Sequence, residues 1–369
     1  MTEIFLIRHT QAEGNLYHMM QGHWDGDVTG LGTRQIEALS ERFRDVKIDA
    51  LYSSDLYRTR MTASAITKYH DVEMKLDSRL REMNMGAWER TYFGNAIYEN
   101  GDMFKKFIFD PENFSYPGAE TYSQVGDRMR EAMTEIVKAN PDKTVVVVSH
   151  GVALRCLLWK LTGWPLTDHE RLPIFGNTGV ARLLYENGEY TVDYINDVSH
   201  LPQSLNPKMK VPELRHVWID PKEHEQYYKG CYEKAWLAAH GNLLDFNAQT
   251  YFDSACRHYR ADGESVAIMY CDDEPAGLID LDTERGKHAD YGWISLLFLE
   301  EKYRGLGCGA QLLGRCIFRC RELGRRAVRL HVSDDNVRAQ KFYLEYHQFE
   351  KIGEESGSNC KLWLLEKKI

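Results

Sequence analysis

The stretch Ile4-Phe5-Leu6-Ile7-Arg8-His9-Thr10 places a polar triplet directly after four apolar residues. A short all-apolar run is typical of a central strand that is buried on both faces of a parallel sheet. Open α/β sheets carry their sites outside the carboxyl ends of such strands. We therefore expect Arg8 and His9 to lie in a functional site at the edge of an α/β sheet.

Three later polar residues also follow predicted strands or extended segments. Arg58 follows a strand over 48–52, Glu82 follows the segment 72–76, and His150 follows a strand over 145–148. Strands that alternate with helices indicate a mostly parallel sheet covered on both faces, so we expect a three-layer α/β/α domain. The helices are predicted over 29–44, 57–69, 122–139 and 152–161.

Two histidines, two arginines and one carboxylic acid are the groups needed to transfer a phosphoryl group through a histidine. A neutral imidazole attacks phosphorus without a metal, since the ordinary pKa of histidine is about 6.5. We expect His9 to be the nucleophile, while Arg8 and Arg58 bind phosphate oxygens. His150 would add a donor or a charge. Glu82 is the expected acid, which protonates the leaving oxygen and then activates water.

Further motifs lie around these residues in a fixed order along the chain. They are Asn15, Gln21-Gly22, Thr29-Gly30-Leu31-Gly32, Ser53-Ser54-Asp55, Gly86 with Trp88-Glu89, Pro117-Gly118, and Ser149-His150-Gly151. With them, residues 1 to about 200 resemble the histidine phosphatase superfamily, whose fold is phosphoglycerate-mutase-like. The resemblance implies that His9 is phosphorylated and that Glu82 is the proton donor. It also implies a phosphate pocket formed by Arg8, Arg58, His150, Asn15, Gln21 and Gly151.

Thr10 and Arg90 depart from the family pattern, because glycine is common at both positions, but neither departure removes a catalytic group. The domain is too short to hold the extra segments of the glycolytic mutases. We therefore interpret it as a phosphatase, with a mutase-type phosphotransferase as the alternative.

A second pattern lies near the other end of the chain. A predicted strand over 293–299 is followed by Arg304-Gly305-Leu306-Gly307-Cys308-Gly309 and a helix over 307–323. Glycines remove the Cβ atoms that would keep backbone amides from a pyrophosphate, and the helix presents its positive end. A polar loop with Asn336 and a helix with Tyr343 follow. The pattern favours an acyl-CoA site.

Residues 214–369 resemble the GNAT family of N-acetyltransferases, an α/β fold with a mixed sheet. The resemblance implies acetyl-CoA as co-substrate, with Asn336 nearby and Tyr343 as the acid that protonates departing CoA. The main-chain amides expected to hold it are those around Leu297, Leu299, Arg304, Gly305, Gly307, Cys308 and Gly309. Glu301 stands where many members have proline. The general base stays open among Glu300, Asp280 and Asp282.

Hydrophobic periodicity fails between 196 and 211, where prolines appear, so we predict a linker. The expected domains are 1–200 and 214–369, joined by residues 201–213. Residues 90–117 are aromatic-rich and are interpreted as an insertion or lid. These residues and the poorly patterned stretch 241–262 are expected to determine specificity.

Composition narrows the classes of partner. The net charge of −9 argues against nucleic-acid binding, which needs a basic surface. Seven of the eight cysteines lie between Cys231 and Cys360 without a C-x-x-C pair, which favours reduced thiols over a disulfide framework or zinc site. No apolar run approaches the roughly 20 residues of a membrane helix. We expect a cytoplasmic protein that requires no metal and binds no membrane; the sequence does not indicate an oligomeric state.

The main hypothesis is a bifunctional enzyme that hydrolyses a small phosphomonoester and acetylates a small amine. One alternative is a phosphatase regulated by a non-catalytic acetyl-CoA-sensing domain. Another is a phosphoprotein phosphatase whose carboxy-terminal domain is a docking module.

Overall fold

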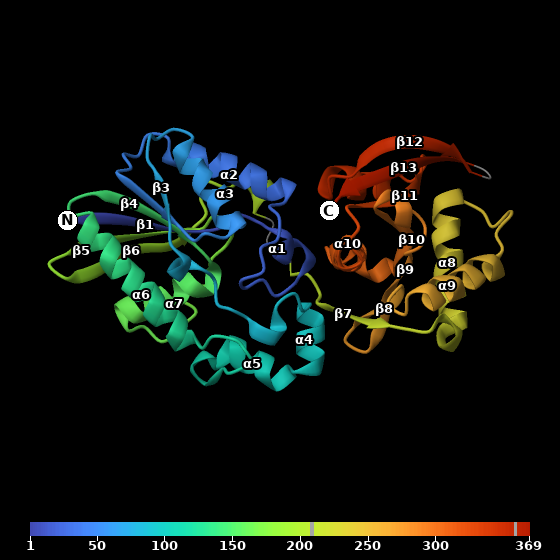
Figure 1. The fold of residues 1–369 in the computed structure, drawn as a ribbon, viewed down its shortest axis with the longest axis horizontal. Coiled ribbons are helices and arrows are strands. Elements are labelled where there is room, and N and C mark those ends of the chain that lie inside the picture. Colours follow the sequence, from blue (N-terminus) through green and yellow to red (C-terminus); the bar gives the residue numbers. More distant parts are fainter. Residues whose placement is uncertain (207–209, 358–359) are drawn as a thin grey trace. The chain divides into compact units, whose positions relative to one another are not determined.

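The computed structural model describes residues 1–206, 210–357 and 360–369. The chain forms two compact units, each with its own sheet (Figure 1). The first unit contains Met1–Thr91 and Glu99–Lys208. The second contains Met209–Ile369 together with the short segment Tyr92–Tyr98.

The first unit is built on a six-stranded mixed sheet with the order β3-β2-β4-β1-β5-β6. The first four strands of this order are parallel, whereas β5 and β6 run antiparallel to their neighbours. The strands are β1 Thr2–Arg8, β2 Ala50–Ser53, β3 Met74–Leu76, β4 Thr144–Ser149, β5 Val180–Glu186 and β6 Glu189–Asp197.

Helices cover both faces of this sheet, with α2 and α3 on one side and α6 and α7 on the other (Figure 1). The three-layer prediction is therefore confirmed. The helices are α1 Glu13–Tyr17, α2 Gly30–Phe43, α3 Tyr57–Thr67, α5 Gly101–Phe109, α6 Tyr122–Ala139 and α7 Gly151–Thr162.

Local sequence explains the central elements. Ile4, Leu6 and Ile7 of β1 are fully buried, as are the valines of β4 beside it, as expected for strands covered on both faces. Thr29 caps α2 by accepting a hydrogen bond from the amide of Gly32. Thr121 and Gln124 form a capping box at the start of α6. These elements hold the carboxyl ends of β1 and β4 side by side.

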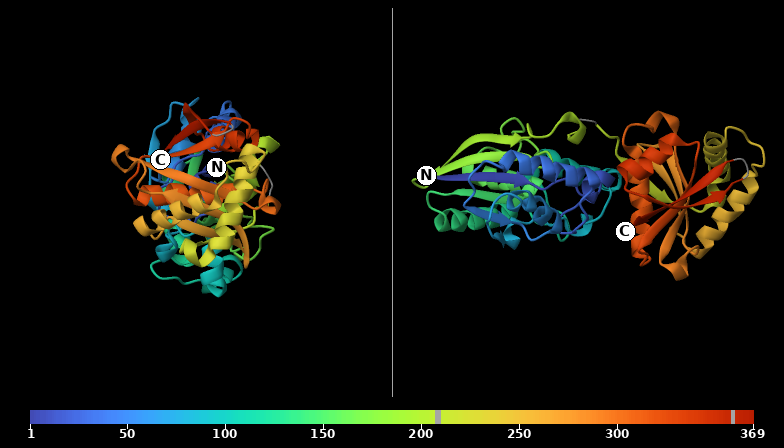
Figure 2. Two further views of the ribbon diagram at one scale, coloured as in Figure 1. Left: turned by 90° about the vertical axis from the view of Figure 1, so that its right-hand side faces the viewer. Right: turned by 90° about the horizontal axis from the view of Figure 1, so that it is seen from above.

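The second unit contains a seven-stranded mixed sheet with the order β12-β13-β11-β10-β9-β8-β7. Only β10 and β11 pair in parallel. Figure 2 shows this sheet from two further directions. Its strands are β7 Leu214–Trp218, β8 Val266–Cys271, β9 Glu274–Asp282, β10 Tyr291–Leu299, β11 Ala327–Ser333, β12 Glu350–Ser356 and β13 Lys361–Lys368.

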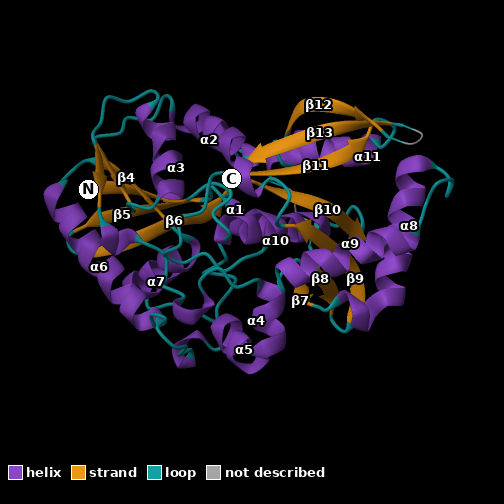
Figure 3. Ribbon diagram, turned by 45° about the vertical axis from the view of Figure 1, so that its right-hand side comes forward, coloured by secondary structure: helices purple, strands orange, loops and turns teal. Residues whose placement is uncertain are grey.

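Helix α10 lies on one face of this sheet, and α8 and α9 lie on the other (Figure 3). The amphipathic helix α10 follows the glycine-rich turn and buries its apolar residues against β9, β10 and β11. The helices are α8 Glu225–His240, α9 Ala248–Ala261, α10 Cys308–Glu322 and α11 Val337–Gln340, followed by a π-helix over Lys341–Tyr346.

Helix α4, Phe93–Glu99, lies within the stretch interpreted as a lid, but its residues up to Tyr98 belong to the second unit. The side-chain amide of Asn95 pairs with the main chain of His216 on the edge strand β7: Nδ2 donates to the His216 carbonyl at 3.1 Å, and Oδ1 accepts from the His216 amide at 3.1 Å. A Cβ at Gly94 would lie 2.3 Å from the carbonyl of Leu214. This glycine therefore allows a close approach that covers the free edge of β7.

Several elements were not predicted from the sequence. Strands β5, β6, β7, β12 and β13 carry mostly half-buried or exposed side chains, so their apolar pattern is weak. Helix α9 lies within 241–262 and buries only Phe252, Ala255 and Cys256. The boundaries 1–200, 201–213 and 214–369 stay a prediction.

Candidate functional site

The first candidate site lies at the carboxyl ends of β1, β2 and β4. His9 directly follows β1, and its amide donates to the carbonyl of Ser149 at the end of β4 at 2.9 Å. Parallel pairing of β1 with β4 therefore brings His9 and His150 to the same edge of the sheet. Their ring centroids are 5.2 Å apart.

His9 is arranged as a neutral imidazole with one free ring nitrogen. Its Nδ1 lies 2.6 Å from the carbonyl oxygen of Thr10, so Nδ1 carries the proton and donates. Burial lowers the pKa of His9 well below its ordinary 6.5, and the positive charges of Arg58 and Arg8 lower it further. The lone pair is therefore on Nε2, the atom that a nucleophilic role requires.

His150 is fully buried opposite His9. Its Nε2 lies 2.9 Å from the hydroxyl of Ser54, which follows β2, while its Nδ1 has no hydrogen-bond partner among the described residues. Burial lowers the pKa of His150 well below 6.5, and Arg58 adds to this effect. A bound dianion would oppose both effects and favour the charged imidazolium.

Arg8 and Arg58 provide the positive charge of the site. Arg58 is completely buried; its Nη2 donates to the carbonyl of Gly22 at 2.8 Å and its Nη1 to that of Trp24 at 3.0 Å. Burial lowers the pKa of Arg58 to about 10. In the described part of the chain, Nε of Arg8 and Nε of Arg58 have no acceptor. Buried donors of this kind are normally paired, so two unpartnered guanidinium nitrogens indicate a place for an anion.

Gln21 is half-buried, and both polar atoms of its amide are buried without a partner among the described residues. Its loop is held by the carboxylate of Glu89, which accepts hydrogen bonds from the amides of His23 at 2.7 Å and Trp24 at 3.1 Å. Arg90, where glycine is common in the family, adopts a positive φ of 66°. Glycine is favoured there because most side chains avoid this backbone region.

Glu82 contacts the start of α7, the helix that follows His150. Its Oε1 accepts a hydrogen bond from the amide of Ala153 at 2.9 Å, and its Oε2 accepts one from the amide of Val152 at 3.2 Å. The positive end of a helix stabilises a carboxylate in this position. Glu82 is therefore fixed at the same sheet edge as His9 and His150.

Asn15 and Gly151, the remaining predicted residues of this site, contact the segments that carry His9 and Arg8. Asn15 Oδ1 accepts from the amide of Ala12 at 3.1 Å and from Asn177 Nδ2 at 3.2 Å. A Cβ at Gly151 would lie 3.3 Å from Arg8 Nε, so this glycine leaves room for the guanidinium. The sequence did not single out Asn177, which also donates to the carbonyl of His9 at 3.1 Å. It follows an irregular loop, and no pattern in the sequence marks it.

The second candidate site is the turn between β10 and α10. Gly305 and Gly307 have φ of 78° and 83°, values that favour glycine. Arg304 Nε donates to the carbonyl of Leu299 at 2.7 Å, and Cys308 is fully buried. The space beside Gly309 is taken by the ring of Phe342, 3.0 Å from where a Cβ would be. Gly305, Leu306 and Gly307 are exposed directly before α10, and the start of a helix is a favourable place for an anion.

Leu297 and Leu299 lie on the part of β10 that extends beyond its pairing with β11, which covers only Tyr291–Trp293. Asn336 caps α11 by accepting from the amide of Ala339 at 3.0 Å. Tyr343 is 7% exposed and packs against Phe349; burial raises the pKa of its phenol. A protonated phenol is the form that an acid needs.

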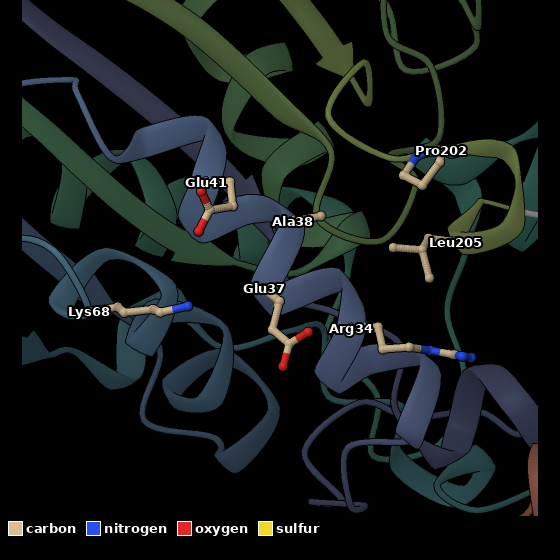
Figure 4. A pocket seen from close by; sticks show the side chains of 7 residues that line it. All are labelled: Arg34, Glu37, Ala38, Glu41, Lys68, Pro202 and Leu205. Atoms are coloured by element: carbon tan, nitrogen blue, oxygen red, sulfur yellow. The ribbon is translucent and has the colours of Figure 1, made fainter.

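An open groove of about 470 Å³ runs along the outer side of α2 (Figure 4). It contains none of the residues of either site. Its lining residues are Arg34, Glu37, Ala38, Glu41, Lys68, Pro202 and Leu205.

Comparison with known proteins agrees with this geometry. Residues 4–198 match the model of the histidine phosphatase superfamily, branch 1. The chain belongs to this superfamily. In the same chain, residues 221–349 match the model of the acetyltransferase (GNAT) family. The second unit is therefore a GNAT domain. Both family matches indicate enzymatic activities.

Individual relatives cover the phosphatase half. The "Probable phosphoglycerate mutase GpmB" of Salmonella choleraesuis (strain SC-B67) is 30% identical over 206 residues, which are 54% of this chain and 95% of the relative. The solved structure of YhfR from Bacillus stearothermophilus is 28% identical, with a TM-score of 0.52, and covers 54% of this chain and 99% of YhfR. These relatives match little beyond the first unit.

Two features are absent from the described residues. No helix among them is long and apolar enough to cross a membrane. Within the same residues, histidine, cysteine and carboxylate side chains do not gather into a group that could hold a metal ion.

Proposed function

We propose that this protein is a bifunctional enzyme that hydrolyses a small phosphomonoester through a phosphohistidine at His9 and acetylates a small amine with acetyl-CoA. One observation supports the first activity above all. Buried polar atoms of Arg8, Arg58, Gln21 and His150 have no partner among the described residues. The charges of both arginines act on His9, whose ring lies 5.2 Å from that of His150. A phosphoryl group supplies the acceptors that these donors lack.

In the first step, His9 Nε2 attacks phosphorus while Arg8, Arg58 and His150 stabilise the charge on the non-bridging oxygens. The bond from phosphorus to the ester oxygen breaks, and Glu82 gives its proton to that oxygen. In the second step, ionised Glu82 takes a proton from water, which attacks phosphohistidine and releases inorganic phosphate.

For the second activity, the fit of acetyl-CoA rests on the glycine turn. Gly305 and Gly307 leave the amides before α10 accessible, and Arg304 and Arg338 add positive charge near the turn. Bound acetyl-CoA would supply an activated acetyl group. Asn336 would lie near it, and Tyr343 would hold the proton that the CoA sulfur receives.

The fusion supports a narrower proposal, in which one metabolite that bears a phosphate and an amine is processed at both sites. An amino-sugar phosphate or a phosphorylated amino acid has this chemistry. His9→Ala, Tyr343→Phe and wild-type protein should be incubated with acetyl-CoA and a metabolite extract, with EDTA present, and the products compared by mass spectrometry. If both variants change the fate of one metabolite, the sites serve one pathway; changes in different metabolites contradict that version.

The same experiment separates the alternatives. Phosphate that moves within a metabolite, with none released, would identify a mutase-type phosphotransferase. If Tyr343→Phe keeps every product but acetyl-CoA still alters the phosphatase rate, the GNAT domain is a sensor. Activity only on phosphopeptides would support the hypothesis of a phosphoprotein phosphatase whose carboxy-terminal domain is a docking module.

A further inference from the structure

The sheet of the GNAT domain opens between two of its central strands. β10 and β11 pair only from Tyr291 to Trp293, opposite Ala327 to Arg329, although β10 continues to Leu299 and β11 to Ser333. Beyond Trp293, β10 pairs with β9 alone, with a bulge between Ile294 and Leu296. The inner edge of β10 therefore presents backbone groups to an extended ligand that carries amides.

The glycine turn lies at the open end of this gap between β10 and β11. It follows Leu299, the last residue of β10, whereas the pairing of β10 with β11 ends at Trp293. Consider a ligand whose pyrophosphate binds at the turn and whose chain extends along β10. Its other end lies near Trp293, where β10 and β11 separate. For acetyl-CoA, as proposed above, that end is the thioester.

His331 lies on β11 two residues beyond Arg329, the last residue that pairs with β10. Side chains two apart on a strand share a face, so His331 lies on the same face as Arg329 and its neighbour Trp293. The imidazole packs edge-on against the Trp293 ring, with centroids 4.7 Å apart, and its side chain is 20% exposed. It is a titratable group at the expected position of the thioester.

Glu355 lies beside this imidazole. Its Oε2 is 3.3 Å from His331 Nε2, within ion-pair distance, but Nε2 makes no aligned hydrogen bond to any described residue. Burial lowers the pKa of His331, Glu355 on β12 raises it, and Arg285 after β9 lowers it. Arg329, on the same strand face, is paired with Glu366 at 2.6 Å. The net effect lowers the pKa of His331 below 6.5, so the ring is neutral near pH 7 and one of its nitrogens has a lone pair.

The carboxylates considered from sequence are engaged elsewhere. Glu300 is paired with Lys234 at 2.8 Å. Asp280 is fully buried and accepts hydrogen bonds from Tyr228 and His258, each at 2.7 Å. Asp282 lies 3.4 Å from the other nitrogen of His258.

We propose that His331 is the general base of acetyl transfer and that Glu355, whose carboxylate lies beside the ring, is a positioning residue; this rests on the proposed acetyltransferase activity. The unprotonated ring nitrogen of His331 takes a proton from the acceptor ammonium, which leaves a neutral amine. The amine nitrogen bonds to the carbonyl carbon of the thioester, and the carbon–sulfur bond breaks. The nitrogen loses two protons in all: one reaches solvent through His331, and the other replaces the proton that Tyr343 gives to sulfur.

The protonation of His331 can be measured without any ligand. Multiple-bond ¹H–¹⁵N spectra of the full chain, with His331→Gln to assign the signal, should show a neutral ring at pH 7. Glu355→Gln should lower the pKa of His331. A charged ring at pH 7, or an unchanged pKa in Glu355→Gln, would overturn the proposal.

Activity gives the second readout. With acetyl-CoA and a panel of amino sugars, amino acids and polyamines, His331→Gln should lower kcat/KM about 10²- to 10⁴-fold. Exposed His288→Gln is the matched control and should leave kcat/KM unchanged. Acetyl-CoA binding, measured by calorimetry, should stay within about threefold in both variants, as expected for a residue that acts on the amine.

The outcomes separate the two proposals. If the wild type acetylates amines and His331→Gln matches it, His331 is not the base although the transferase proposal stands. If the wild type binds acetyl-CoA but acetylates nothing, the transferase proposal fails and the role of His331 fails with it.

Discussion

Oε1 of Glu82 accepts a hydrogen bond of 2.9 Å from the main-chain amide of Ala153. This contact ties the carboxylate to the first turn of α7, directly after His150. A residue held by a helix start keeps its position while substrates change. Glu82 is thus oriented by the backbone of α7.

Glu82→Gln can still accept the hydrogen bond from the Ala153 amide through its oxygen, but its NH2 group cannot accept the one from Val152, and the side chain cannot transfer a proton. We expect kcat for an alkyl phosphate to fall about 10²- to 10⁴-fold, the usual contribution of general acid–base catalysis. The loss should be smaller for p-nitrophenyl phosphate, whose leaving group needs little protonation. Glu73→Gln, at an exposed position, is the control. Equal losses on both substrates would contradict the role of Glu82 as the acid.

Arg58→Lys should weaken phosphate binding, because lysine lacks the planar fork that contacts two oxygens. Lysine also cannot replace both bonds from Arg58 to the carbonyls of Gly22 and Trp24. We expect kcat/KM to fall at least about tenfold per lost charged hydrogen bond, and inhibition by vanadate to weaken in parallel. Arg60→Lys, at an exposed position of the same helix, should change neither value.

The phosphatase should stay active in mild acid. His9 must be neutral to attack, and its pKa is lowered well below 6.5 by burial and by the charges of Arg58 and Arg8. As pH falls, Nε2 is protonated only below that range. The acidic limb of kcat/KM, corrected for ionisation of the substrate, should therefore have its midpoint well below 6.5. A midpoint at 6.5 or above would show that the pKa of His9 is not lowered in the free enzyme.

His258 should make the stability of the GNAT domain dependent on pH. Burial lowers its pKa, but hydrogen bonds to Asp280 and Asp282 outweigh this effect and raise the pKa to about 9. The stabilisation is complete below the ordinary 6.5 and is lost as pH rises through 9. The raised value corresponds to about 3 kcal/mol, for a side chain that is 12% exposed.

Urea unfolding at pH 6 and pH 10 measures this effect. The difference in unfolding free energy between wild type and His258→Gln should be larger at pH 6. His288→Gln, at an exposed position, should show no such pH-dependent difference. An equal difference at both pH values would mean that His258 stabilises the domain by packing alone.

Asn95→Ala should destabilise the second unit. The substitution leaves the amide and carbonyl of His216 without their partners at the edge of β7. An unpaired backbone group costs about 1–3 kcal/mol when fully buried, and the partly buried groups of His216 should cost less than that. Thermal unfolding should show a lower midpoint than for Asn113→Ala, which removes an exposed amide. Equal midpoints would show that solvent replaces the contact.

The sequence predicted the reacting residues of the first site better than the residues that hold them in place. His9, Arg8 and Arg58 could be found because each follows a strand or a short motif, and strand ends meet at one edge of a parallel sheet. Asn177 could not be found, since it comes from an irregular loop whose position depends on the whole fold.

The same limit applies to the second unit. The glycine turn before α10 is a local signal, and the sequence showed it. The separation of β10 from β11, which places His331 at a strand opening, depends on pairing between distant segments. Helix α4 is a similar case, because nothing in residues 92–98 indicates that they pack with a strand that begins at Leu214.

That placement of α4 has a consequence for synthesis on the ribosome. Residues 92–98 emerge long before β7, the strand whose edge they cover. Domains generally fold as their chains emerge, amino-terminal parts first. Here the sheet of the first unit can form before β7 is translated, whereas α4 can cover the edge of β7 only afterwards. A second unit made from Met209 onward would therefore lack the helix that covers this edge.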